Sequence, residues 1–178
     1  MQFRHQYRLP LQPSDALALH RDHVPDFGPR LPGVGHVERV SFERSEDGGQ
    51  VVCHEWHGDL SVIPMLLRSR IGLAGFRWSD RTVWDSAGRG CLWNLGIPIL
   101  GEGARIEGRY SFDPCAGGTQ VNVDACLLFD IGNDSPFVQN ALGRRLLPVV
   151  ERFVVWLFKR VMGSSADVIR AYAVPVAA

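Results

Sequence analysis

The stretch 146–162 constrains the fold most, because its apolar residues recur three and four positions apart. This spacing predicts a helix with one broad apolar face, formed by Leu146, Val149, Val150, Phe153, Val154, Leu157, Phe158 and Val161. We expect the helical region to run from about 135 to 173, with a bend or second start near Gly143 and Pro148 and an end or bend at Gly163. An apolar face of this width needs a partner surface, so the helix should lie on another layer of the protein.

The rest of the chain predicts mainly strands, which would supply that layer. Residues 2–9 alternate strictly between apolar and polar side chains, and further strands are predicted over 34–44, 50–60, 76–85, 90–98, 104–113 and 119–131. A short helix with Ser14 as its N-cap and a Pro/Gly-rich kinked region separate the first two strands. The segment 61–75 breaks the strand pattern and predicts a short helix or a flap. Its Arg68 and Arg70 would either meet an anionic ligand group or face water.

Composition indicates one globular domain spanning residues 1–178, since 46% of the residues are apolar and 21% are charged. Nineteen basic residues balance nineteen acidic ones, which disfavours a nucleic-acid partner. The four cysteines form neither a CxxC pair nor a spacing suited to zinc, so we expect no metal. No nucleotide-binding or hydrolase motif is present, so no cofactor is expected either.

The chain shows no apolar signal core at its start and no uncharged apolar run of ~20 residues. We therefore expect a cytoplasmic protein without a transmembrane segment, although transient contact with a membrane stays open. The oligomeric state is left undetermined by these features.

The order of these segments resembles the START-like superfamily, also called SRPBCC, birch-pollen-allergen-like or helix-grip. The residues that carry the resemblance are the strand Phe3 to Leu9, the segment Asp26-Phe-Gly-Pro-Arg-Leu-Pro-Gly-Val34, and the passage from Val121 to Val161. The resemblance covers the whole chain. It implies an α+β fold in which a curved antiparallel sheet of about six to seven strands wraps around a long C-terminal helix, with a short helix pair after the first strand.

A finer resemblance concerns Glu55-Trp56 and the apolar, Pro-containing segment that follows and ends near Gly72. This arrangement is similar to the PRELI-type phospholipid carriers. The chain lacks the lysines that such carriers tend to present, so none of their lipid-contacting positions is carried over.

A curved sheet closed by one helix can leave a cavity, which would bind a hydrophobic small molecule or lipid. From strand alternation we expect the ligand-binding residues to be His5, Tyr7, Phe42, His54, Trp56, Phe76, Trp78, Trp84, Trp93 and Tyr110, together with Phe153 and Leu157 from the helix. The alternative is that the same aromatic side chains fill a solid core.

Polar residues expected on the same face include Glu38, His54 and Asp80. Glu38 and His54 could pair across the hairpin and act as a general acid–base couple, or they could form a satisfied structural contact. Asp80 could instead mark the open end of its strand.

Three functions remain open at this point. The first is binding or transfer of a hydrophobic molecule without chemistry. The second is an enzyme like the polyketide cyclases and aromatases of the superfamily, using dehydratase-like acid–base chemistry in the same pocket. The third is a protein-interaction module, which a solid interior and a large exposed apolar patch would favour.

Overall fold

The computed structural model describes residues 1–46, 48–65, 76–101, 103–131, 135, 138 and 141–173. The strands of this part of the chain are β1 (Gln2–Leu9), β2 (Val34–Arg44), β3 (Gln50–Gly58), β4 (Arg77–Trp84), β5 (Gly90–Gly96), β6 (Ala104–Cys115) and β7 (Gly118–Phe129). The helices are α1 (Pro13–Asp22), α2 (Val24–Phe27) and α4 (Ala141–Ala173), with short 3-10 turns η1 (Gly28–Arg30), η2 (Leu60–Val62) and η3 (Pro98–Leu100).

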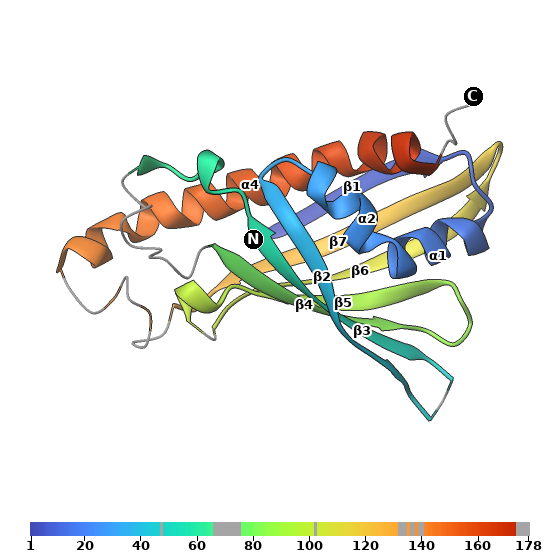
Figure 1. The fold of residues 1–178 in the computed structure, drawn as a ribbon, viewed down its shortest axis with the longest axis horizontal. Helices are drawn as coiled ribbons and strands as arrows, with labels where there is room; N and C mark the ends of the chain where they lie inside the picture. Colours follow the sequence, from blue (N-terminus) through green and yellow to red (C-terminus); the bar gives the residue numbers. More distant parts are fainter. Residues whose placement is uncertain are drawn as a thin grey trace.

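The seven strands within the described residues form one antiparallel sheet in the order β1-β7-β6-β5-β4-β3-β2. Strands β2 to β7 follow one another as a meander, and β1 closes the far edge by pairing with β7. Figure 1 shows α4 lying along this sheet, with α1 and α2 beside its C-terminal half. The predicted α+β helix-grip architecture, with short helices after the first strand, is confirmed.

Strand β1 shows why alternation predicted the sheet well. Its odd-numbered side chains face the core, where Tyr7 and Leu9 are buried, while its even-numbered side chains are exposed. Each of its residues pairs with one of β7, from Gln2 opposite Cys126 to Leu9 opposite Thr119. The period of two therefore places one half of the strand in the interior.

Helix α4 is continuous over 33 residues, with Pro148 inside it. Its buried hydrophobic residues recur at helical spacing and are Val150, Phe153, Val154, Leu157, Phe158, Ala166 and Ile169. Of the expected helical region before residue 141, the described residues 135 and 138 are not helical, and Gly163 does not end the helix. Burial of each large apolar side chain contributes about 1.5–3 kcal/mol, so packing on the sheet outweighs the unfavourable propensity of one proline and two glycines.

Helix α1 starts two positions earlier than the predicted N-cap Ser14 implied. Its N-cap is Gln12, without a side-chain cap, and Pro13 occupies the first helical turn. A proline is well placed there because its fixed φ suits a helix and its missing N–H would have had no partner within the helix. The prediction of Ser14 as the N-cap was therefore wrong.

Strand β2 carries an irregularity that reverses the predicted facing of part of the strand. Val37 pairs with Trp56 and Glu38 with Glu55, and the register shifts between Arg39 and Ser41. Of these two neighbours in the sequence, Val37 is buried and Glu38 is exposed. Predicting Glu38 on the inner face was thus wrong by one residue, which is enough to move a side chain to the opposite face.

The segment after β3 is described only as far as residue 65. It contains η2, which Asp59 caps by accepting a hydrogen bond of 2.8 Å from the Ser61 backbone N–H. The remainder of the predicted flap, with Arg68 and Arg70, lies outside the described residues. Within those residues, α4 included, we find no helix with the length and hydropathy needed to span a membrane.

Candidate functional site

A cavity of about 160 Å³ lies between the inner face of the sheet and α4. Its wall is formed by side chains from β1, α1, α2, the strands β2 to β6 and the helix α4. Most of these side chains are aromatic or aliphatic, with a small number of polar groups among them. This is the usual make-up of a site for a small organic molecule.

Two aromatic clusters form much of the wall. Trp78 lies between Trp56 and Phe76, with ring centroids 6.0 Å and 5.1 Å away. Trp93 lies between Tyr110 and Phe158, at 6.1 Å and 6.2 Å. Because these rings pack against one another as well as lining the cavity, they hold its shape in the absence of a ligand.

Most side chains predicted to bind the ligand do line this cavity, namely Tyr7, His54, Trp56, Phe76, Trp78, Trp84, Trp93, Tyr110 and Leu157. Alternation was sufficient to predict the common direction of the strand residues, and helical spacing predicted that of Leu157. That they contact a ligand is a prediction to be tested.

The other three predicted residues lie outside the cavity wall. His5 stands on the edge strand β1 between Phe3 and Tyr7, where Phe158 of α4 packs directly against Phe3 at 5.4 Å. Phe153 is buried in contact with Phe76. Each of these two sites is filled by protein side chains.

Phe42 faces the same side of the sheet as its partner Val52, yet it is 44% exposed. Phe42 stands on the edge strand β2, whose hairpin with β3 reaches beyond the layer of helices (Figure 1), whereas Val52 on the neighbouring strand β3 is fully buried. Alternation correctly predicted the direction of Phe42 but could not predict where the covering layer stops.

A hydrogen-bonded pair, Tyr7 and His20, stands in the wall. The Tyr7 hydroxyl lies 2.6 Å from His20 Nε2, and His20 Nδ1 lies 2.6 Å from the Ala16 carbonyl oxygen. A carbonyl can only accept, so Nδ1 carries the proton and the tyrosine hydroxyl donates to Nε2. Burial lowers the pKa of His20 to about 4 and raises the pKa of Tyr7, so both side chains are neutral at pH 7.

A second polar cluster is centred on Asp80. Its Oδ1 accepts from Trp56 Nε1 at 2.6 Å and lies 3.2 Å from His54 Nδ1, while its Oδ2 accepts from the Thr82 hydroxyl at 2.9 Å. His54 is 3% exposed, and His54, Asp80, Trp56 and Thr82 all line the cavity. The Asp80 carboxylate therefore contacts three side chains in the cavity wall and does not mark an open strand end.

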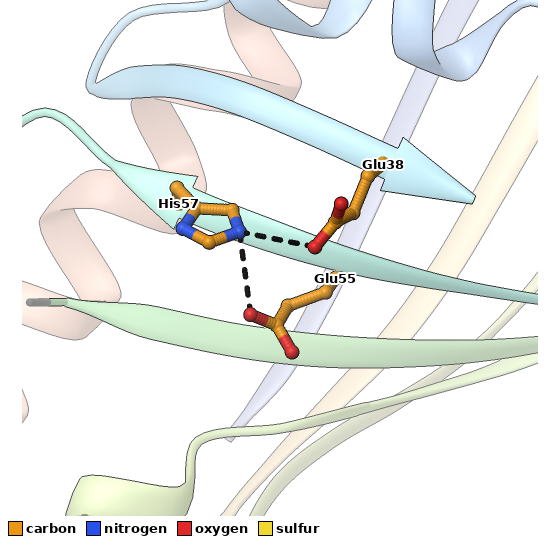
Figure 2. Close-up of side chains that lie close together, drawn as sticks. All are labelled: Glu38, Glu55 and His57. Carbon is orange, nitrogen blue, oxygen red and sulfur yellow. Dashed lines mark ion pairs between the residues drawn. The ribbon is translucent and has the colours of Figure 1, made fainter. Parts of the chain in front are cut away.

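The predicted pairing of Glu38 with His54 is wrong. Figure 2 shows Glu38, Glu55 and His57 together, and His57 Nε2 lies 3.5 Å from Glu38 Oε1 and 3.2 Å from Glu55 Oε1. These residues belong to the outer face, because Glu38 and Glu55 alternate with the inward-facing Val37 and Trp56. His54 pairs with Asp80 instead, across the neighbouring strand.

The outer-face cluster has the residue types of a cation site, since its candidate ligand atoms all lie within 4.8 Å of one another. Glu55 Oε1 is also 3.0 Å from the Arg77 guanidinium, which balances its charge. The Glu38 side chain is 54% exposed. We therefore assign no metal to this cluster.

His20 is one of the cavity residues that the sequence interpretation missed. It follows Ala16 by four positions and therefore lies on the apolar face of α1, as the predicted helix already implied. The importance of Asp80 was harder to see. Its partners come from three positions on two strands, and only the β3–β4 register places His54 opposite it.

No protein-family model matches the sequence, and no curated protein is similar to it in sequence. Solved structures do resemble its fold. TTHA0849 from Thermus thermophilus matches with a TM-score of 0.62 and 18% identity, over 98% of this chain and 100% of that one. The Zhui aromatase/cyclase from Streptomyces sp. R1128 matches with a TM-score of 0.52 and 20% identity, over 97% of this chain and 98% of that one. Ara h 8.0201 matches with a TM-score of 0.50 and 11% identity, over 92% of this chain and 95% of that one.

The chain has the START-like, helix-grip fold. At these identities the likeness to solved START-like structures concerns the fold, and a fold is compatible with several functions. The finer resemblance to PRELI-type carriers stays a prediction.

Proposed function

We propose that this START-like chain, as one ligand-binding domain over residues 1–178, binds a hydrophobic small molecule or lipid between its sheet and α4. The observation that carries the proposal is the cavity of about 160 Å³ with its wall of mainly aromatic and aliphatic side chains. The cytoplasmic location expected from the sequence and transient contact with membranes belong to the same proposal.

The affinity would come mainly from apolar surface removed from water, at roughly 25 cal/mol per Å² before the costs of ordering. The wall rings already pack against one another, so few side chains need to be ordered when a guest binds. Burial also raises the pKa of the Cys91 thiol and of the Tyr110 phenol. These two wall groups are therefore uncharged at neutral pH, which suits an apolar guest.

A cavity-filling substitution tests the proposal. Val154 is buried on α4 and lines the cavity, whereas Val149 on the same helix is 38% exposed and lies outside the lining. Val154→Phe should weaken binding of the uncharged fluorescent probe N-phenyl-1-naphthylamine by about tenfold or more, because the added ring occupies its space. Val149→Phe makes the same chemical change and should leave the affinity within about twofold.

Probe fluorescence titrations, with thermal unfolding to verify that both variants fold, give the result. Equal affinities for the wild type and both variants would show that the probe binds at the surface. Absence of binding to the folded wild-type protein would also count against the proposal.

A second function, cyclase- or dehydratase-like acid–base catalysis, has specific support. The cavity wall holds the Tyr7–His20 pair and the His54–Asp80 pair, which are residue types able to move protons. An apolar molecule extracted from the purified protein and then returned to it would separate the two functions. Conversion detected by mass spectrometry favours the enzyme, and unchanged recovery favours the carrier.

The third function, a protein-interaction module, has less support. A solid interior would have favoured it, whereas the interior contains a cavity. Exposed apolar side chains such as Val40 and Leu92 lie on different strands of the sheet, and single exposed residues of this kind are common on soluble proteins.

A further inference from the structure

The Asp80 cluster fixes the orientation of the His54 ring. The Asp80 carboxylate accepts hydrogen bonds from Trp56 Nε1 and the Thr82 hydroxyl, and its Oδ1 lies 3.2 Å from His54 Nδ1. Both oxygens of Asp80 already act as acceptors, so the proton of this contact is on Nδ1. In the neutral ring, His54 Nε2 therefore carries the lone pair and is a hydrogen-bond acceptor.

His54 Nε2 has no hydrogen-bond partner among the described residues, although its side chain is 3% exposed and lines the cavity. A buried polar atom without a partner costs about 1–3 kcal/mol. The cavity is the space beside this side chain that is not filled by protein. We therefore expect the hydrogen-bond partner of His54 Nε2 to come from an occupant of the cavity.

The indole N–H groups of Trp84 and Trp93 are also without an acceptor within the described part of the chain. Both side chains are buried and line the same cavity, from β4 and β5, the strands that follow His54 on β3. The wall thus offers one free acceptor and two free donors in an otherwise apolar surface. A hydroxyl group can donate to the first and accept from the others, which a hydrocarbon cannot do.

We propose that His54 Nε2 accepts a hydrogen bond from a hydroxyl group of the guest, so that the cavity selects hydroxylated aromatic or alicyclic molecules. This inference rests on the proposed function, because it names the polar group of the same ligand. Asp80 acts as a positioning residue, since it holds the His54 ring with Nε2 free.

The test uses two probes of similar shape, 2-naphthol and 2-methylnaphthalene, of which only the first can donate a hydrogen bond. His54→Asn keeps an amide nitrogen near the place of Nδ1, for Asp80, and removes Nε2. This substitution should weaken the binding of 2-naphthol by about tenfold and the binding of 2-methylnaphthalene by less than about twofold. His54→Gln, whose amide oxygen reaches toward the place of Nε2, should retain most of the 2-naphthol affinity.

The matched control is His36→Asn, the same substitution at an exposed histidine on the outer face of the β2–β3 hairpin. It should change neither affinity. A measurement on the wild-type protein does not depend on the folding of any variant: the ¹⁵N resonance of His54 Nε2 should shift on addition of 2-naphthol and stay in place with 2-methylnaphthalene.

Each outcome bears on a different statement. If both probes bind and His54→Asn weakens them equally or not at all, or if the Nε2 resonance does not respond to 2-naphthol, the inference is overturned while the proposed function stands. If neither probe binds the folded wild-type protein, the proposed function fails and the inference fails with it.

Discussion

His20 shows how the interior changes the chemistry of a single residue. Its ring is enclosed by Tyr7, Phe27, Tyr110 and Phe112, with centroids between 5.0 Å and 6.4 Å away. Removal from water disfavours the imidazolium, and the hydrogen bond to the Ala16 carbonyl only partly opposes this effect. The pKa of His20 is therefore about 4 in the folded protein.

This lowered pKa predicts a pH dependence of stability. The unfolded chain protonates His20 near the ordinary pKa of 6.5, whereas the folded protein excludes that proton down to about pH 4. The contribution of His20 to the free energy of unfolding is fully present above pH 6.5. It is lost as the pH falls from 6.5 to about 4, by about 3 kcal/mol in total. Urea unfolding of the wild type and of His20→Gln at several pH values measures it.

The difference between the two free energies of unfolding isolates His20, because the other titrating groups are common to both proteins. It should shrink by about 3 kcal/mol from pH 7 to pH 4. Parallel curves over this range would show that His20 titrates in the folded protein as it does in water.

Among the elements, the pair β5–β6 holds the cavity wall through a close contact. Trp93 lies opposite Gly108, and a Cβ at Gly108 would overlap the Trp93 ring and lie 2.7 Å from the Asp124 carbonyl oxygen. Glycine is needed at this position so that the indole can lie across β6.

Gly108→Ala should therefore lower the free energy of unfolding by about 1–3 kcal/mol, because the tryptophan or the strand must move. Gly96→Ala on β5 is the control, since its Cβ would meet only the Ser79 hydroxyl oxygen at 3.6 Å. Chemical denaturation compares the two variants. Similar small effects would mean that Trp93 adapts without strain.

The elements also show what the sequence could and could not predict. Alternation along β1, β3 and β5 predicted which side chains face the cavity, because a strand repeats every two residues. The irregularity between Arg39 and Ser41 is not visible as a pattern, so Glu38 was predicted on the wrong face. The pairing of His54 with Asp80 depends on the register of two strands, which the sequence leaves open.

For the whole molecule, the residue patterns predicted a long amphipathic helix lying on a sheet, because each element must bury its apolar face, and the START-like resemblance implied the helix-grip architecture. The size of the cavity could not be predicted in this way. It depends on how the rings of residues such as Phe76 and Trp93 pack against Phe153 and Phe158 of α4. The same aromatic composition could have filled the core.

Whether an apolar guest enters the space between sheet and α4 is most directly tested by isotope-filtered NMR on the labelled protein with unlabelled 2-methylnaphthalene. We predict intermolecular nuclear Overhauser effects from the guest to the wall residues Phe76, Trp93 and Leu157, and none to the exposed residues Val40 and Leu92. Contacts confined to exposed side chains, or no contacts at a saturating concentration of the guest, would contradict the account.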